Sequence, residues 1–458
     1  MVTKSGLQWS SRVVFLMATI GSAVGLGNIW RFSYAAGSSG GGAFVVVYLA
    51  AALFLALPVL IAELMIGRRG AESPPNAIAN VAIESGYGKN WRWMGIFLGG
   101  VGAVLALSFY SVVGAWTIAF ATKTVLGQLQ GLQPEEIVTI IDDLNSKPLI
   151  LFGWFCLFIG LTIYISSKGV KDGLERAVNI MMPALFVMLV LIVFYSAIVG
   201  DFNAALNFLF KPDFSKLNAQ VVMGAFGQAF FSVSVGLANC IAYGSYLDRT
   251  TNIPESATII VGVDTLVAIL AGLAIFPIIF AHGFQPNEGP DLVFKALPIA
   301  FGQIPGGLIF GALFFILLFF AALTSSISMM EAPVAWLSDG LKFSRKSAAL
   351  LSGSVSFCFG TLAVLSFNIL SDFYPLDGIA LFSGKNFFVL IDYLVTNIIM
   401  PLGGMIIALF AGWIVKEKFS RDELFDNQNH LLHRFWLFLV RFVAPAILGV
   451  VFFQLVSS

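Results

Sequence analysis

Long apolar stretches follow one another along this chain, separated by short polar segments. A helix needs roughly 20 apolar residues to cross a bilayer core of about 30 Å. Eleven stretches reach about that length, and the expected spans are 12–36, 41–67, 92–122, 149–167, 175–199, 219–246, 255–281, 305–338, 348–370, 387–415 and 435–456. The strict alternation that marks the strands of a membrane barrel is not seen. The pattern therefore predicts an all-α integral membrane protein with eleven transmembrane helices.

Composition points the same way. Of 458 residues, 58% are hydrophobic and 11% are charged, and the mean hydropathy is +0.91. A soluble domain carries about 25% charged residues. These values exclude a soluble domain, a disordered chain, a secreted disulfide scaffold and a basic nucleic-acid binder. We expect the lipid bilayer and a small molecule as partners, no nucleic acid, and a chain able to act as a monomer.

The basic residues predict the orientation. With the N-terminus in the cytoplasm, 17 of the 25 Lys and Arg residues fall on the cytoplasmic side and six fall outside. Such a bias is typical of membrane proteins. Eleven spans then place the C-terminus outside. We expect a multi-pass protein of a cell membrane, specifically a prokaryotic inner membrane, with segment 282–304 folded back over the outer face.

Two spans carry similar interruptions. Val24-Gly25-Leu26-Gly27-Asn28 and Val235-Gly236-Leu237-Ala238-Asn239 match at four of five positions, each near the middle of a span. Five spans separate them, so the two repeats would have opposite membrane topology. Paired broken helices point to the binding site of a transporter, although Gly-rich helix packing would look similar. The expected single domain, 1–458, comprises a first repeat (12–199, helices 1–5), a second repeat (219–415, helices 6–10) and an eleventh helix (435–456).

Unwound backbone at the membrane midplane is tolerated only where it lines a cavity. In such a place free N–H groups can hold a carboxylate, and free carbonyl groups can hold Na⁺.

Four strings place this chain beside a known family. It resembles the neurotransmitter:sodium symporters, which have the LeuT fold, at 25–32 (GLGNIWRF), 40–44 (GGGAF), 228–234 (QAFFSVS) and 322–327 (ALTSSI). The similarity runs in order from Trp9 to about residue 415. The family usually has twelve spans, and the absence of a twelfth leaves the five-plus-five inverted repeat intact. This resembles the prokaryotic eleven-helix amino-acid transporter branch.

The resemblance implies symport driven by sodium, with two sodium sites. The first would use the substrate's carboxylate together with Ala23, Asn28, Ser232 and Asp264. The second would use backbone oxygens of Gly21, Val24 and Ala321 and the hydroxyls of Thr324 and Ser325. An alternative for these hydroxyls is hydrogen bonding within their own helix.

Gly25 is informative about the substrate. Monoamine carriers of the family have an aspartate there, so an uncharged residue implies a substrate that brings its own carboxylate, which is an amino acid. Tyr110 matches the tyrosine that steadies this carboxylate, unless it is an ordinary core tyrosine. The expected substrate-binding residues are Ser22, Ala23, Gly25, Leu26, Gly27, Ala106, Tyr110, Phe231, Ser232, Ser234, Leu237, Ser325 and Met329. None is charged, and burying an unpaired charge is costly. We therefore expect uptake of hydrophobic neutral L-amino acids, aliphatic to aromatic.

Asp264 also bears on chloride. Chloride-dependent relatives have an asparagine there, with Tyr48 and Ser232 matching further chloride partners and Ala268 replacing a serine. A fixed carboxylate supplies the negative charge that chloride would bring. We expect no chloride requirement. A helix-packing role is the alternative for Asp264.

The resemblance also implies gates. The outer gate would pair Arg31 with Asp392, joined by Gln228, and a permanent salt bridge is the alternative. The inner gate would use Trp9 and Asp339, although Gly6 stands where the family has an arginine, with Lys4 nearby. The spacing of Gly173 and Pro183 matches a helix-5 unwinding element, and an ordinary kink is the alternative. Glu63 is expected to cap backbone N–H groups freed by the broken helices.

Other classes fit less well. The chain has no HExxH, GxSxG or P-loop motif, which argues against a membrane enzyme. A channel would need a continuous hydrated path, and an amino-acid sensor would bind its ligand without accumulating it.

Overall fold

Helices make up nearly all of the structure, a computed structural model that describes residues 8–130, 132, 134–286, 292–425 and 430–457. No strand occurs within these ranges. The helices at the positions of the expected spans are α1 (Arg12–Ala23), α2 (Phe32–Ser38), α3 (Gly42–Ala51), α4 (Leu57–Gly70), α6 (Arg92–Gly95), α7 (Ala103–Val125), α9 (Pro148–Ser167), α10 (Arg176–Val199), α12 (Ala219–Val233), α13 (Asn239–Gly244), α14 (Ile253–Ala281), α16 (Gly307–Gly340), α17 (Arg345–Leu365), α18 (Phe387–Tyr393), α19 (Met400–Leu409), α21 (His430–Phe438) and α22 (Ala444–Ser457).

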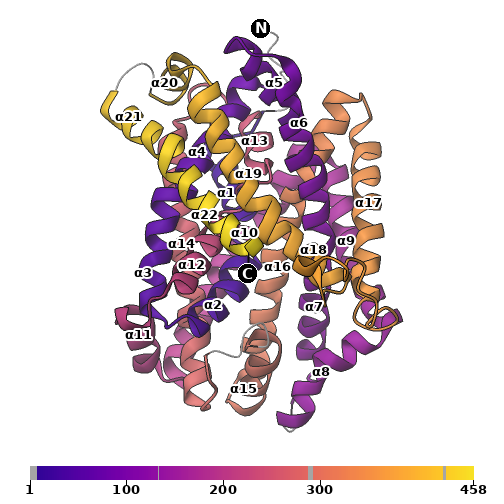
Figure 1. Ribbon diagram of the computed structural model, residues 1–458. Coiled ribbons are helices and arrows are strands. Elements are labelled where there is room, and N and C mark those ends of the chain that lie inside the picture. The colour runs from indigo at the N-terminus through magenta and orange to yellow at the C-terminus, as the bar shows by residue number, and fades with distance from the viewer. Residues whose placement is uncertain (1–7, 131, 133, 287–291, 426–429, 458) are drawn as a thin grey trace.

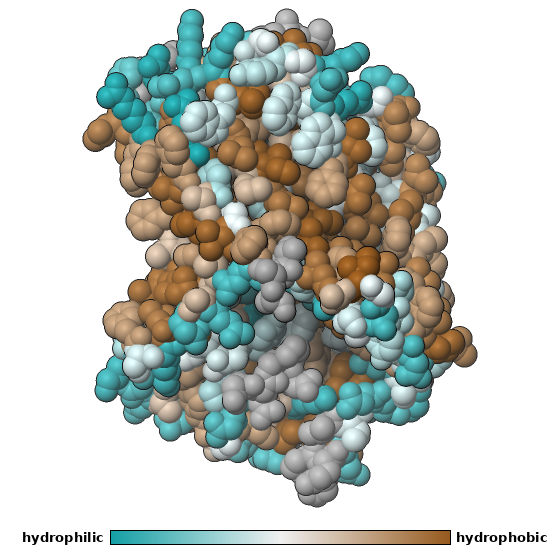
Figure 2. Space-filling model, viewed as in Figure 1, coloured by the Kyte–Doolittle hydropathy of each residue, from teal (hydrophilic) through white to brown (hydrophobic). Residues whose placement is uncertain are grey.

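Nine of the described helices are long and apolar enough to cross a membrane, counting helices joined by a π-helical turn as one. The pair α1 and α2, bent by 50°, would make ten. The remaining expected span, 219–246, is the short pair α12 and α13. On the face shown in Figure 2, a belt of apolar side chains crosses the molecule between two polar ends. The chain is therefore a multi-pass membrane protein.

The first break lies between α1 and α2. Val24 leaves helical geometry with a ψ of 104°, and a π-helical segment, Gly27–Arg31, leads into α2. Gly25 and Gly27 lie at this break, where the missing side chains let neighbouring groups approach the backbone.

The second break lies between α12 and α13. Ser234, Gly236 and Ala238 all adopt left-handed backbone conformations, with φ of 57°, 95° and 59°. Two of the three carry a Cβ, which makes this conformation costly. The stretch therefore cannot be helical, and it leaves N–H groups for other partners.

Shorter helices cover the two ends. They are α5 (Pro74–Glu84), α8 (Pro134–Ser146), α11 (Phe202–Phe210), α15 (Leu297–Gln303) and α20 (Glu417–Phe425). The N-terminus lies at one end of the molecule with α5 and α20, and α8, α11 and α15 lie at the other (Figure 1). Phe294, just before α15, packs against Trp30, Trp116 and Phe120. The described part of 282–304 thus folds back over the bundle, as expected.

Three span ends lie about five residues from their expected places: span 5 begins at Val170, the last span begins at His430, and the span expected to end at 370 ends early. The span expected at 348–370 is helical over α17 only to Leu365, and turns follow. The Ser366 hydroxyl donates to the Ala363 carbonyl at 2.7 Å and accepts from the N–H of Phe388 at 3.2 Å. The bond with Phe388 fastens the end of α17 to the start of α18.

Candidate functional site

A cluster of oxygen-bearing side chains lies beside the first break. The Asn28 amide donates to Oδ1 of Asp264 at 2.7 Å and to Oγ of Ser232 at 2.8 Å. The Ser232 hydroxyl donates to Oδ2 of Asp264 at 2.7 Å, and the Gly25 N–H donates to the Asn28 side-chain oxygen at 3.0 Å. Asn28, Ser232 and Asp264 are fully buried. Three residues expected at the first sodium site therefore lie in contact. Asn28 and Ser232 come from the two broken spans, and Asp264 comes from α14.

Tyr48 joins this cluster from α3. Its hydroxyl lies 3.2 Å from that of Ser232. Ala23, the fourth expected residue, lines the pocket next to the cluster. Carboxylate, amide and hydroxyl oxygens are hard ligands, which suit an alkali or alkaline-earth cation better than a transition metal. The donor set therefore fits sodium.

A second oxygen cluster joins α1 to α16. The Ser325 hydroxyl lies 3.4 Å from the carbonyl oxygens of both Gly21 and Val24. The Thr324 hydroxyl donates back to its own helix, at 3.1 Å to the carbonyl of Ala321. All five residues expected at the second sodium site thus lie in one neighbourhood. Ser325 reaches across to span 1, which a hydroxyl bonded only within its helix would not do.

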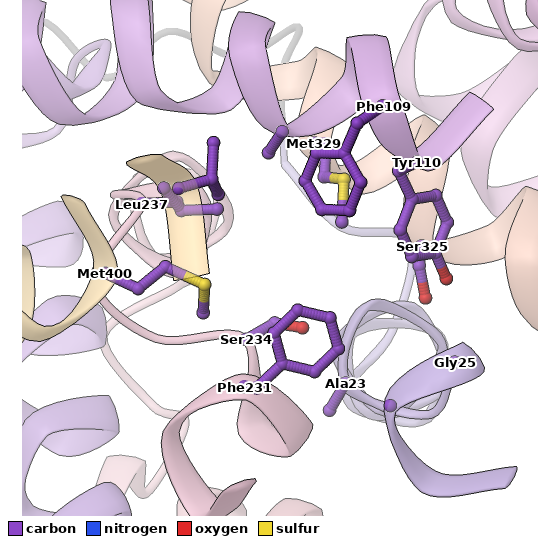
Figure 3. Close-up of a pocket in the computed structure, with 13 residues that line it drawn as sticks. Ala23, Gly25, Phe109, Tyr110, Phe231, Ser234, Leu237, Ser325, Met329 and Met400 are labelled. Carbon is purple, nitrogen blue, oxygen red and sulfur yellow. The ribbon is translucent and has the colours of Figure 1, made fainter. Parts of the chain in front are cut away.

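A small apolar pocket is lined by one residue expected at each sodium site, Ala23 and Ser325 (Figure 3). Its volume is about 20 Å³, and it is lined by Ala23, Gly25, Gly27, Ala106, Phe109, Tyr110, Phe231, Ser234, Leu237, Ser325, Met329, Val395 and Met400. Figure 3 shows the hydroxyl ends of Tyr110 and Ser325 together on the Gly25 side, with Leu237 and Met400 at the other end. No charged side chain is in this lining.

The polar end of the pocket is built around Gly25. The Leu26 N–H donates to the Tyr110 hydroxyl at 3.3 Å. A Cβ on Gly25 would lie 2.5 Å from Ser325 Oγ and 2.9 Å from Tyr110 Oη. Only glycine lets the two hydroxyls approach this backbone, so the same N–H and hydroxyl groups can face a carboxylate.

Three expected substrate residues do not line the pocket. Ser22 pairs its hydroxyl with that of Ser328. Ser232 donates to Asp264 in the first cluster, and Leu26 lines a second cavity. The pocket gains Phe109, Val395 and Met400, which were not expected. Phe109 follows Ala106 by three residues on α7, and that helical spacing is a signal that could have identified it.

The second cavity, of about 70 Å³, lies outside the pocket and shares Phe109, Tyr110 and Phe231 with it. These three side chains therefore separate the pocket from the second cavity. The Arg31 guanidinium lies over the Phe231 ring, 4.3 Å from its centroid. Arg31 and Asp392 both line this cavity. Among the described residues they do not form an ion pair within 4.0 Å, and Gln228 instead donates to the Gly27 carbonyl at 2.8 Å.

Glu63 of α4 holds the second break. Its carboxylate accepts the Gly236 N–H at 2.7 Å and the Cys240 N–H at 3.2 Å. The side chain is fully buried. These are backbone groups freed by the interruption of span 6, so Glu63 has the capping contacts expected from the sequence.

The end of the bundle nearer the N-terminus is closed by aromatic and polar contacts. Trp9 donates its indole N–H to the Tyr243 carbonyl at 3.0 Å. Buried Glu331 accepts from the Tyr246 hydroxyl at 2.6 Å and from Arg345 at 2.8 Å. Asp339 is partly exposed at the end of α16. Lys4 and Gly6 lie outside the described residues.

Span 5 begins irregularly. A π-helical segment, Val170–Glu175, precedes α10, and Pro183 lies inside α10. A Cβ on Gly173 would lie 2.1 Å from the Ile165 carbonyl oxygen. Close packing therefore requires glycine here, whatever the segment does during transport.

Comparisons with known proteins agree with this architecture. The model of the sodium:neurotransmitter symporter family matches residues 7–132 and 136–458. An uncharacterized sodium-dependent transporter of Bacillus subtilis, YhdH, is 37% identical over 98% of each chain. One from Methanocaldococcus jannaschii is 30% identical over 97% of this chain and 89% of its own.

A solved structure gives the same picture. The crystal structure of MhsT in complex with L-phenylalanine aligns with a TM-score of 0.88 and 39% identity, covering 98% of this chain and 99% of MhsT. MhsT has the LeuT fold, with its five-plus-five inverted repeat, and this chain shares it. The protein is a sodium-dependent transporter and not an enzyme, and it belongs to the sodium:neurotransmitter symporter family.

Proposed function

We propose that this protein couples the sodium gradient to uptake of hydrophobic neutral L-amino acids, from aliphatic to aromatic, by alternating access and without chloride. The observation that carries the proposal is the pocket itself. One end offers the Leu26 N–H and the Tyr110 hydroxyl beside Gly25. The other end is apolar and includes Leu237 and Met400. This polarity matches a carboxylate at one end and an uncharged side chain at the other.

Two sodium ions would bind beside this pocket. The first would use Ala23, Asn28, Ser232 and Asp264, with the substrate's carboxylate completing the shell. The second would use Gly21, Val24, Ala321, Thr324 and Ser325. Because the Asp264 carboxylate is already present at the first site, chloride would add no charge that the site lacks.

The pocket is too small, at about 20 Å³, for an amino acid without movement of its lining. A single water occupies about 10–15 Å³ by this measure. Three side chains are best suited to move. They are the unbranched Met329 and Met400 and the Phe231 ring, which separates the pocket from the second cavity. The phenylalanine bound by MhsT supports a pocket able to admit an aromatic side chain.

The gates and the release step complete the cycle. Arg31 and Asp392, with Gln228 nearby, would close the outer side around the substrate. Trp9 and Asp339 would close the inner side. Unwinding between Gly173 and Pro183 would then let water reach the second sodium. We place the N-terminus in the cytoplasm and the C-terminus outside, in a prokaryotic inner membrane, with a monomer as the working unit.

Uptake into proteoliposomes tests the proposal. Labelled phenylalanine and leucine are offered with an inward sodium gradient or an equal potassium gradient, in chloride and then in gluconate. We expect accumulation with sodium only and equally in both anions, blocked by excess methionine or tryptophan and not by glutamate, proline or glycine. Binding without accumulation would indicate a sensor, and flux without saturation would indicate a channel.

A further inference from the structure

The segment of residues 8–11, here called the N-terminal segment, is fastened to two different spans. Trp9 donates its indole N–H to the Tyr243 carbonyl and its backbone N–H to the Tyr246 carbonyl at 3.3 Å. The Trp9 ring packs edge-on against both tyrosines, with centroids 5.2 and 6.0 Å away. The next residue, Ser10, bonds instead to Glu175 at the start of span 5.

The contact with Glu175 is bidentate. The Ser10 hydroxyl donates to Oε2 at 2.6 Å, and the Ser10 N–H donates to Oε1 at 3.0 Å. Glu175 is only 5% exposed. Within the described part of the chain, every hydrogen bond to this carboxylate comes from Ser10. If the N-terminal segment moves away, a buried charge loses its partners, which is a costly state unless water replaces them.

Glu175 is also the last residue of the π-helical segment Val170–Glu175. This segment follows Gly169, whose φ is 94°, and π-helices are rare and often occur at functional positions. The segment is therefore the part of span 5 that can open to admit water with the least loss of regular helix.

We propose that Ser10 and Glu175 form a latch that couples displacement of the N-terminal segment to unwinding of Val170–Glu175. While Ser10 is in place, the carboxylate is satisfied and the segment stays folded. When Ser10 leaves, hydration of Glu175 favours the open segment. Glu175 acts here as a positioning residue, because it touches neither the substrate pocket nor the two oxygen clusters.

The same span leads to the second oxygen cluster. A Cβ on Gly21 would lie 3.0 Å from the Met182 sulfur of α10, so α10 packs directly on the backbone that carries the Gly21 carbonyl. Opening at Glu175 would thus start at the end of the helix that covers this cluster. The inference rests on the proposed function in this respect, since it names the trigger that releases the second sodium.

Hydrogen exchange of the full-length purified protein, read by mass spectrometry in sodium and in potassium, tests the latch. The variants are Ser10→Ala, Glu175→Gln and their combination. Ser10 is exposed, so we expect its substitution to leave the packing of the core unchanged. The matched control is Glu255→Gln in α14, which removes a carboxylate whose ion pair, at 2.8 Å, is with Arg12 of α1.

We expect each single variant to speed exchange of the amides of 170–175 in sodium by about tenfold, as for the loss of a charge-assisted hydrogen bond. The combined variant should exceed the stronger single variant by little, because both changes weaken the same contact; Ser10→Ala removes its hydroxyl bond and keeps its N–H bond. The control should match the wild type. Unchanged exchange in both single variants, additive effects in the combination, or an equal rise in the control would each overturn the latch.

The readout separates this inference from the proposed function. No amino acid is present, so a wrong substrate assignment would not alter it. If the backbone amides of the wild-type protein exchange at the same rate in sodium and in potassium, the proposed sodium binding itself is wrong.

Discussion

Single residues decide what this site can hold, and Gly25 does so by lacking a side chain. Its Cα lies where two hydroxyls converge, which leaves no room for the aspartate that an amine-binding relative would need. Asp264 contributes in the opposite way, by adding a fixed charge where Asn28 and Ser232 already meet. Gly25 keeps a negatively charged side chain out of the pocket, and Asp264 places one in the adjacent oxygen cluster.

Gly25→Ala should weaken phenylalanine binding in sodium by about tenfold or more, because overpacking a filled site costs about 1–3 kcal/mol. Equilibrium binding of labelled phenylalanine measures the effect. Gly153→Ala in α9, where an added Cβ would meet no atom within 4 Å, is the control. Equal affinity in the two variants would show that Gly25 does not shape the binding end of the pocket.

Asp264→Asn should make uptake depend on chloride. The wild type should transport equally in chloride and gluconate, whereas the variant should lose about tenfold or more of its uptake in gluconate, since a charge in a buried site is worth more than 1 kcal/mol. Sodium-driven uptake in the two anions is the measurement. A variant that is equally active in both would mean that the carboxylate does not stand in for an anion.

At the scale of elements, buried ion pairs tie distant helices together. Arg68 at the end of α4 donates to Glu423 of α20 at 2.6 Å, and also to the backbone carbonyls of Thr251 and Glu423. Both side chains are less than a tenth exposed. One arginine thus joins α4, α20 and the turn before α14.

Arg68→Ala should lower the temperature of unfolding in detergent by several degrees, because buried Glu423 then keeps only its ion pair with Arg69 at 3.2 Å, a loss of about 1.5–3 kcal/mol. Arg12→Ala breaks an exposed pair with Glu255 and should cost about 1 kcal/mol or less. The fraction of monodisperse protein after heating measures both. Equal melting of the two variants would show that burial adds nothing to the Arg68 pair.

At the scale of the whole molecule, the apolar belt and the distribution of basic residues determine how the protein sits in the membrane. The N-terminus lies at the same end as α5 and α20, and α8, α11 and α15 lie at the other (Figure 1). The excess of Lys and Arg on the side of the N-terminus predicts that this end faces the cytoplasm.

Cysteine labelling in whole cells checks this orientation. In a Cys358→Ser background, which removes an exposed native thiol, Lys147→Cys after α8 should react with a membrane-impermeant maleimide in intact cells. Arg421→Cys in α20 should react only after permeabilisation. The reverse pattern would invert the proposed topology.

Much of this architecture could be predicted from the sequence, because broken helices leave a local signature. Gly25 and Gly27 in one span and Gly236 in another mark the interruptions directly. The oxygen clusters followed from the resemblance at those same strings. Such features need only neighbouring residues to be recognised.

Contacts between distant segments could not be predicted in this way. Ser10 and Glu175 are 165 residues apart, and Arg68 and Glu423 are 355 apart. Val395 and Met400 were missed because a span that is apolar all around gives no sign of which face meets the pocket. Only packing fixes that rotation.

The capping contacts of Glu63 have a consequence for how the protein is made. The Gly236 N–H that donates to its carboxylate is encoded 173 residues later. At ribosomal speeds of about 5–20 residues per second, that interval lasts roughly ten to thirty-five seconds. During biogenesis the Glu63 carboxylate of span 2 therefore lacks its N–H partners until span 6 has been synthesised and inserted. We expect nascent chains that end before span 6 to be held by the insertion machinery or cleared by proteolysis, and chains that include α13 to become resistant.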